Sequence, residues 1–121
     1  MFPKNTLAWI HKTTGSPETV LSLENIALPA CSNDNLGLKL LGAPVNPADL
    51  NMIQGVYPTK SIYGIGGNEG LWEVDFVGSN LASQFSKGDW VIPAYQGIGY
   101  YTLYKFLEHG RNIEYWNHLK L

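Results

Sequence analysis

Residues 46–57 read NPADLNMIQGVY, and the fold prediction for the middle of the chain rests on this stretch. Asn46 belongs to the residue types that cap helices, and Pro47 suits the first helical position because its ring presets a helical φ. Gly55 can adopt the positive φ that commonly ends a helix. The pattern therefore predicts a short helix of two turns over residues 46–55.

Strand-like segments surround this helix. Apolar and polar side chains alternate along them with a period of two, and glycine and proline punctuate the chain between them, which is typical of a domain of strands and turns. We expect a hairpin first, an edge strand or a bulge at Pro93, and a short terminal helix from about Asn112. The predicted strands are residues 6–11, 19–24, 37–43, 70–77, 90–94 and 101–106.

Composition limits the class of protein. With 121 residues and 45% hydrophobic content, the chain has the size of one domain that can bury a core. The formal net charge of −2 gives no basic footprint for nucleic acid, and no apolar run approaches the length that spans a bilayer. The first residues are not rich in Arg and Ser, so no mitochondrial presequence is expected within this chain.

Metal and phosphate sites are not expected. The three histidines, His11, His109 and His118, lack the spacing of metal ligands, and Cys31 is the only cysteine. The glycine-rich residues 64–70, GIGGNEG, lead into a strand, whereas phosphate loops lead into a helix. We therefore interpret them as a bend where two backbones pass closely, and the Glu69 carboxylate as a group that fixes this loop by accepting amide hydrogen bonds.

Tyr57 is the candidate for chemistry. It follows the predicted helix end by two residues and precedes Pro58, so a rigid turn would hold its phenol in place. A phenol normally keeps its proton at neutral pH and can donate a hydrogen bond to a developing oxyanion. On spacing alone, a packed aromatic side chain is the more common explanation for such a tyrosine.

Four motifs, taken in their order along the chain, favour a functional role for Tyr57. They are NPADLNMIQGVYP at 46–58, GGNEG at 66–70, VGSN at 77–80 and KGDWVIPA at 87–94. Together they resemble the N-terminal catalytic domain of the medium-chain dehydrogenase/reductase superfamily. The resemblance is specific over residues 37–104, and it is strongest to the mitochondrial trans-2-enoyl thioester reductases, particularly the fungal ones.

This resemblance implies a mainly β fold with short helices, a GroES-like and partly open β-barrel, over residues 1–106. It implies NADPH-dependent reduction of trans-2-enoyl thioesters of coenzyme A or acyl carrier protein, in fatty-acid synthesis in the mitochondrial matrix, and homodimers among full-length members. The catalytic tyrosine of the family falls on Tyr57. Asn46 matches an asparagine near the nicotinamide, although capping explains Asn46 equally well. Zinc-dependent relatives carry Cys and His at these motifs, and this chain does not, so the resemblance is to the zinc-free branch.

The chain also departs from the family. It has no GxGxxG unit of the kind that opens a Rossmann cofactor domain, and its tail at residues 107–121 no longer resembles the family. Divergence, a truncated gene product and an altered reading of the gene all stay open as origins of the tail. We expect the chain to be inactive alone. The alternative is a non-catalytic module that binds a partner protein through aromatic residues such as Tyr115 and Trp116.

Overall fold

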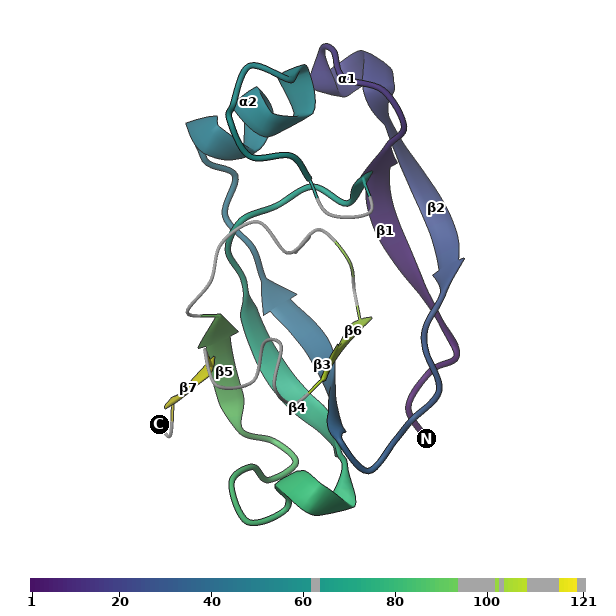
Figure 1. Cartoon of the computed structure of the whole chain (residues 1–121), viewed down its shortest axis with the longest axis vertical. Coiled ribbons are helices and arrows are strands. Elements are labelled where there is room, and N and C mark those ends of the chain that lie inside the picture. Colours follow the sequence, from purple (N-terminus) through teal and green to yellow (C-terminus); the bar gives the residue numbers. More distant parts are fainter. Residues whose placement is uncertain (62–63, 94–101, 103, 109–115, 120–121) are drawn as a thin grey trace.

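The computed structural model describes residues 1–61, 64–93, 102, 104–108 and 116–119. The chain folds mainly into strands with a few short helical segments (Figure 1). The elements are β1 (Asn5–His11), α1 (Pro17–Val20), β2 (Leu21–Ala27), β3 (Asn35–Gly42), α2 (Pro47–Gln54), β4 (Leu71–Val77), a 3-10 turn (Ser79–Leu81), β5 (Trp90–Pro93), β6 (Tyr104–Glu108) and β7 (Trp116–Leu119).

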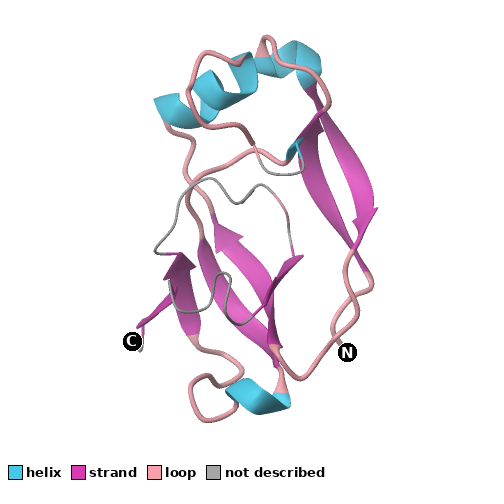
Figure 2. Ribbon diagram, in the orientation of Figure 1, coloured by secondary structure: helices cyan, strands magenta, loops and turns pink. Residues whose placement is uncertain are grey.

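The strands form two antiparallel sheets (Figure 2). One is the β1–β2 hairpin, and the other has five strands in the order β6-β3-β4-β5-β7. Two isolated bridges join β1 to residues outside the named strands, Ala8 to Thr102 and Ile10 to Ile65. This arrangement confirms the predicted mainly β, GroES-like architecture, and the described strands form two sheets and no single closed barrel.

The hydrophobic core lies on the five-stranded sheet. On β4, Trp72 and Val74 are fully buried, while Glu73 and Asp75, which alternate with them along the strand, are partly exposed, as predicted. Gly37 on β3 passes directly against the ring of Phe2, because a Cβ there would lie 2.6 Å from the ring. The buried apolar cluster comprises Leu36, Leu38, Trp72, Val74, Leu81, Phe85 and Val91.

Two sequence predictions need correction. The expected strand from Thr19 to Glu24 begins only at Leu21, because Pro17 at the first helical position starts the helical turn α1, which takes up Thr19 and Val20.

The expected terminal helix is wrong over Trp116–Leu119. These residues form β7, which pairs with β5, whose backbone groups offer an edge that another strand can complete. Residues 112–115 of that predicted helix lie outside the described part of the chain. β5 is therefore flanked by β4 and β7, and Pro93 lies past the two β5 residues that pair with β4. No helix in the described residues is both long and apolar enough to cross a membrane.

Candidate functional site

Helix α2 holds the two sequence-predicted site residues at its ends. Asn46 is the N-cap with an extended backbone, and Gly55 ends the helix with a φ of +82°. The N–H of Val56 donates to the Asn51 carbonyl at 3.0 Å, which closes the last turn. A Cβ at Gly55 would lie 2.8 Å from the Thr14 side chain, so both φ and space favour glycine there. The prediction of a helix over residues 46–55 is confirmed.

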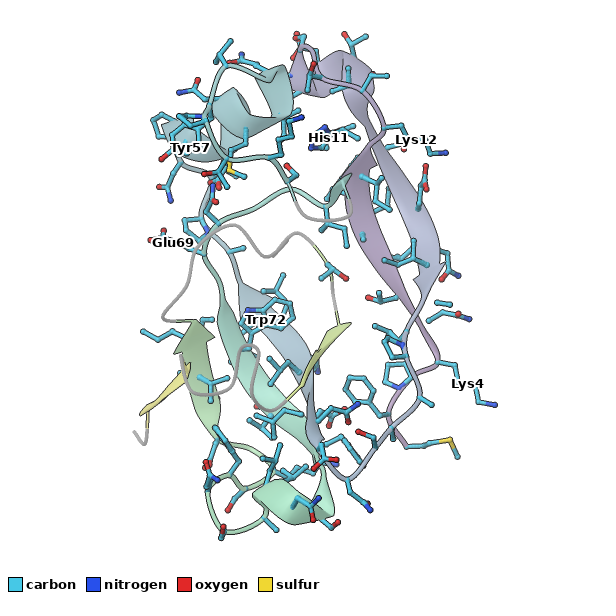
Figure 3. The ribbon with its side chains drawn as sticks, viewed as in Figure 1. Lys4, His11, Lys12, Tyr57, Glu69 and Trp72 are labelled. Atoms are coloured by element: carbon cyan, nitrogen blue, oxygen red, sulfur yellow. The ribbon has the colours of Figure 1, made fainter. Side chains whose placement is uncertain are left out.

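Tyr57 stands on the loop that follows this helix. Its side chain is 39% exposed, and Figure 3 shows it beside α2 at the outside of the molecule. A phenol in this position is open to a ligand, in contrast to the packed aromatic that spacing alone favours. Within the described residues, no hydrogen bond joins it to the polar groups at the start of α2.

A buried carboxylate organises the start of α2. Asp49 is only 1% exposed, and its Oδ2 accepts a hydrogen bond from the Asn46 N–H at 2.7 Å. Its Oδ1 accepts two more, from the backbone N–H of Asn68 at 2.9 Å and from Asn68 Nδ2 at 2.6 Å. Because all three donors approach one carboxylate, Asp49 fastens the helix start to the loop before β4.

A second contact runs parallel to the first. Asn46 Nδ2 donates to Glu69 Oε2 at 2.8 Å, so the Asn46 side chain is held by the loop that Asp49 already fixes. Glu69 accepts an amide hydrogen bond, as expected, but the donor is the Asn46 side chain, so its role in fixing the glycine-rich loop stays a prediction. The structural roles of Asp49 and Asn68 were not predicted from the sequence. An acid at the third helical position is the signal that could have found the contact to Asn46.

The glycine-rich loop brings two backbones together, as predicted. Gly64 has a φ of +70°, and a Cβ there would lie 2.6 Å from the His11 carbonyl oxygen. The N–H of Gly66 donates to the Trp9 carbonyl at 3.4 Å. The loop therefore lies along β1 and then enters β4, with no helix at its end.

The third polar cluster lies at the end of β1. The His11 ring is buried, with Nε2 2.8 Å from Ser61 Oγ and Nδ1 3.1 Å from the Thr13 carbonyl oxygen. Sequence reasoning considered His11 only as a metal ligand. No group of three or more His, Cys, Asp or Glu side chains that could hold a metal ion occurs in the described ranges.

An open groove lies elsewhere. It has a volume of about 830 Å³ between the β1–β2 hairpin, β3 and α2, and neither Tyr57 nor Asn46 is among its described lining residues. Its lining is almost wholly apolar, with Trp9, Leu40 and Ile53 among the lining side chains. The polar groups that the sequence singled out are therefore separate from this groove, and the site is defined by the ends of α2.

Comparisons with known proteins agree on one family, although no protein-family model matches the chain. The mitochondrial enoyl-[acyl-carrier-protein] reductase of Rattus norvegicus is 42% identical over 98 residues, which cover 80% of this chain and 26% of the rat protein. The solved complex of the reductase Etr1p with NADP and crotonyl-CoA matches with a TM-score of 0.83 and 34% identity, over 95% of this chain and 34% of that one.

The mitochondrial 2-enoyl thioester reductase heterodimer Etr1p/Etr2p of Candida tropicalis matches with a TM-score of 0.82 and 34% identity, over 95% of this chain and 34% of that one. The chain thus spans about a quarter of the length of the curated relatives that it matches, as in the rat protein with 26%. Sequence and fold agree over most of the chain, which therefore resembles part of the mitochondrial enoyl thioester reductases of the medium-chain dehydrogenase/reductase superfamily.

Proposed function

We propose that this chain is the tyrosine-bearing part of an NADPH-dependent reductase of trans-2-enoyl thioesters. The observation that carries the proposal is the joint match, in sequence and in fold, to reductases of which one is solved with NADP and crotonyl-CoA. Tyr57 supports it, because its phenol is exposed on the loop directly after α2. By the same relatives, we propose that the substrate is carried on coenzyme A or acyl carrier protein and that the protein works in mitochondrial fatty-acid synthesis.

The chemistry gives the Tyr57 hydroxyl a defined task. When the β carbon of a 2-enoyl thioester accepts hydride, the carbon–carbon double bond shifts and negative charge collects on the thioester oxygen. A phenol that donates a hydrogen bond to this oxygen stabilises the charge as it forms. The α carbon then takes a proton, for which the same hydroxyl is the candidate donor. The transfer of hydride and proton saturates the double bond and leaves the thioester intact.

Asn46 is the residue of this chain that we propose for the cofactor. When bound, NADPH supplies the hydride. The Asn46 side chain is partly exposed and is held by Glu69 at 2.8 Å, so its amide is fixed in direction before a ligand arrives. An amide held in this way fits the carboxamide of a nicotinamide ring. In the described residues the glycine-rich loop leads into β4 and offers no helix N-terminus for phosphates, so we propose a contact of Asn46 with the nicotinamide end alone.

The remaining expectations follow from the relatives as proposals. Because the chain spans 26% of the rat protein, we propose that it needs further protein to complete the cofactor site and is inactive alone. The heterodimer from Candida tropicalis supports dimerisation of the complete protein. The division into a catalytic domain at residues 1–106 and a tail at residues 107–121 stays a prediction.

The test is an assay of the complete gene product that contains this chain. NADPH consumption would be followed with crotonyl-CoA and, in parallel, with free crotonic acid, which lacks the thioester. We expect turnover with the thioester and little with the acid, because the acid carries a negative charge where the thioester has a neutral carbonyl. No NADPH consumption with crotonyl-CoA would overturn the proposal.

The alternative function, a non-catalytic module that binds a partner protein, has one observation in its favour. The apolar groove is bordered by the large side chains Leu7, Trp9 and Leu23, all of them exposed. A pull-down from the native cell extract with and without residues 107–121 separates the two ideas. Loss of a specific partner on removal of the tail, without reductase activity in the complete protein, would favour the module. No partner with either version would exclude it.

A further inference from the structure

Among the described residues, the hydrogen bonds that hold the loop carrying Tyr57 lie at its two ends. At its start, the N–H groups of Gly55 and Val56 donate to carbonyls of the last turn of α2, at 3.2 and 3.0 Å. Residues 56–60 are all exposed, and in the described part of the chain no hydrogen bond is seen for residues 57–60. The position of the phenol therefore depends on what fixes the far end of the loop.

Ser61 fixes that far end through a buried histidine on β1. Its Oγ lies 2.8 Å from His11 Nε2, and His11 Nδ1 lies 3.1 Å from the Thr13 carbonyl oxygen. A carbonyl oxygen only accepts, so in the neutral ring Nδ1 carries the proton and Nε2 is the acceptor. The Ser61 hydroxyl consequently donates to His11. With only 9% of His11 exposed, water competes poorly for this bond.

From Gly64 on, the described chain lies against β1. Ile65 bridges Ile10, and Gly66 donates to Trp9, so this segment runs antiparallel to the end of β1. Figure 3 shows His11 at that end of β1, close to the helices, with Tyr57 on the other side of α2. The bond between Ser61 and His11 is thus the first side-chain anchor that the loop meets after Tyr57.

We propose that the His11–Ser61 hydrogen bond positions the phenol of Tyr57 by fastening the loop of residues 56–61 to β1. His11 and Ser61 are positioning residues that act through Tyr57 and touch no reacting atom. The chemical role of the Tyr57 phenol rests on the proposed function. The position of the phenol does not. Without the bond, the loop samples more conformations, and the phenol spends less time in any one of them.

The direct test observes Tyr57 itself in this chain. Fluorotyrosine is placed at position 57, and the fluorine NMR line is compared between the native chain and Ser61→Ala, with circular dichroism as the check on the fold. We expect a narrow line in the native chain and a broader line, shifted toward that of a fluorotyrosine peptide, in Ser61→Ala. Ser61→Thr keeps the hydroxyl and should restore the native line.

Two further variants keep the test decisive. His11→Gln places an amide oxygen near the position of Nε2, so the Ser61 hydroxyl keeps an acceptor and most of the narrow line should remain. This variant tests the His11 side of the bond with a substitution of similar size that the buried site can accommodate. Ser83→Ala removes an exposed serine hydroxyl elsewhere and should change nothing. A folded Ser61→Ala chain with the native fluorine line would overturn the proposal.

A kinetic cycle in the complete gene product then separates this inference from the proposed function. Ser61→Ala should lower kcat roughly fivefold, the factor for loss of one ordinary hydrogen bond, with little change in KM. In a Tyr57→Phe background the same change should have no further effect. A full fivefold loss in both backgrounds contradicts positioning through Tyr57. If Tyr57→Phe itself is without effect, the proposed role of Tyr57 fails, and the fluorine result still decides whether the bond holds the loop.

Discussion

The five-stranded sheet and the β1–β2 hairpin both have alternating sequences, but they bury opposite kinds of side chain. On β4 the large apolar side chains point inward, and Trp72 is fully buried. On β1 the small and polar residues Thr6 and Ala8 are buried, while Trp9 is 45% exposed beside the groove of about 830 Å³. Alternation therefore fixes that two faces differ, but the neighbouring elements decide which face is inside.

The reason for the reversal lies in what each face of the hairpin meets. Ala8 forms a backbone bridge with Thr102, and the hydroxyls of Thr6 and Thr102 lie 3.2 Å apart, so small side chains are needed for close approach there. The large side chains of β1 and β2 then point to the opposite side, where they line the groove with residues of α2 and β3. The sheet has a closed core, and the hairpin has an open apolar face.

The largest effect is expected from a substitution in the buried core of the five-stranded sheet. Trp72→Ala removes the largest fully buried side chain, and we expect a loss of about 3–5 kcal/mol in the free energy of unfolding, enough to unfold a marginal domain. Urea unfolding followed by circular dichroism measures it. A loss below about 1 kcal/mol, within the range of surface substitutions, would show that this cluster is not the main core.

An intermediate effect is expected at the polar junction between helix and loop. Asp49→Asn keeps the shape of the side chain but replaces one acceptor oxygen by a donor, which then faces backbone N–H groups. We expect a loss of about 1–3 kcal/mol in the free energy of unfolding. The matched control is Asp34→Asn, because this exposed residue can keep an acceptor oxygen for Asn80 Nδ2. Equal stability of the two variants would mean that the Asp49 contacts contribute little.

The smallest effect is expected from a tryptophan on the exposed face of the hairpin, Trp9, which can be compared directly with Trp72. Trp9→Ala alters the open face, and we expect a change within about 0.5–1 kcal/mol in the free energy of unfolding, since the side chain is already 45% exposed. Measured in the same urea series as Trp72→Ala, it should be clearly the milder of the two. A loss as large as that of Trp72→Ala would show that the hairpin face is packed in solution.

Local patterns gave much of the fold correctly. The ends of α2 follow from Asn46, Pro47 and Gly55, whose chemistry acts within a few residues, and β4 follows from a strict alternation. The helical turn α1 was missed because Pro17 suits both a turn and a first helical position. The strand β7 was missed because a local pattern near the end of the chain carries no information about an available sheet edge at β5, which is 23 residues or more away in the sequence.

The candidate site was predictable in part. The motif order drew attention to Tyr57 and Asn46, but the partners that hold the site come from distant segments, as Asp49 with Asn68 and His11 with Ser61 show. Single-sequence patterns carry no information about such long-range pairs. The buried position of His11 likewise depends on the loop that crosses the end of β1.

We propose that the hydroxyl of Tyr57 stabilises the charge formed during reduction of the thioester. This role is tested most directly by the kcat of the complete gene product with crotonyl-CoA and NADPH, native against Tyr57→Phe, with the exposed neighbour Val56→Ala as control. We expect Tyr57→Phe to lower kcat on the order of 10²- to 10³-fold, with Val56→Ala close to native. Equal kcat for Tyr57→Phe and the native protein would contradict the account.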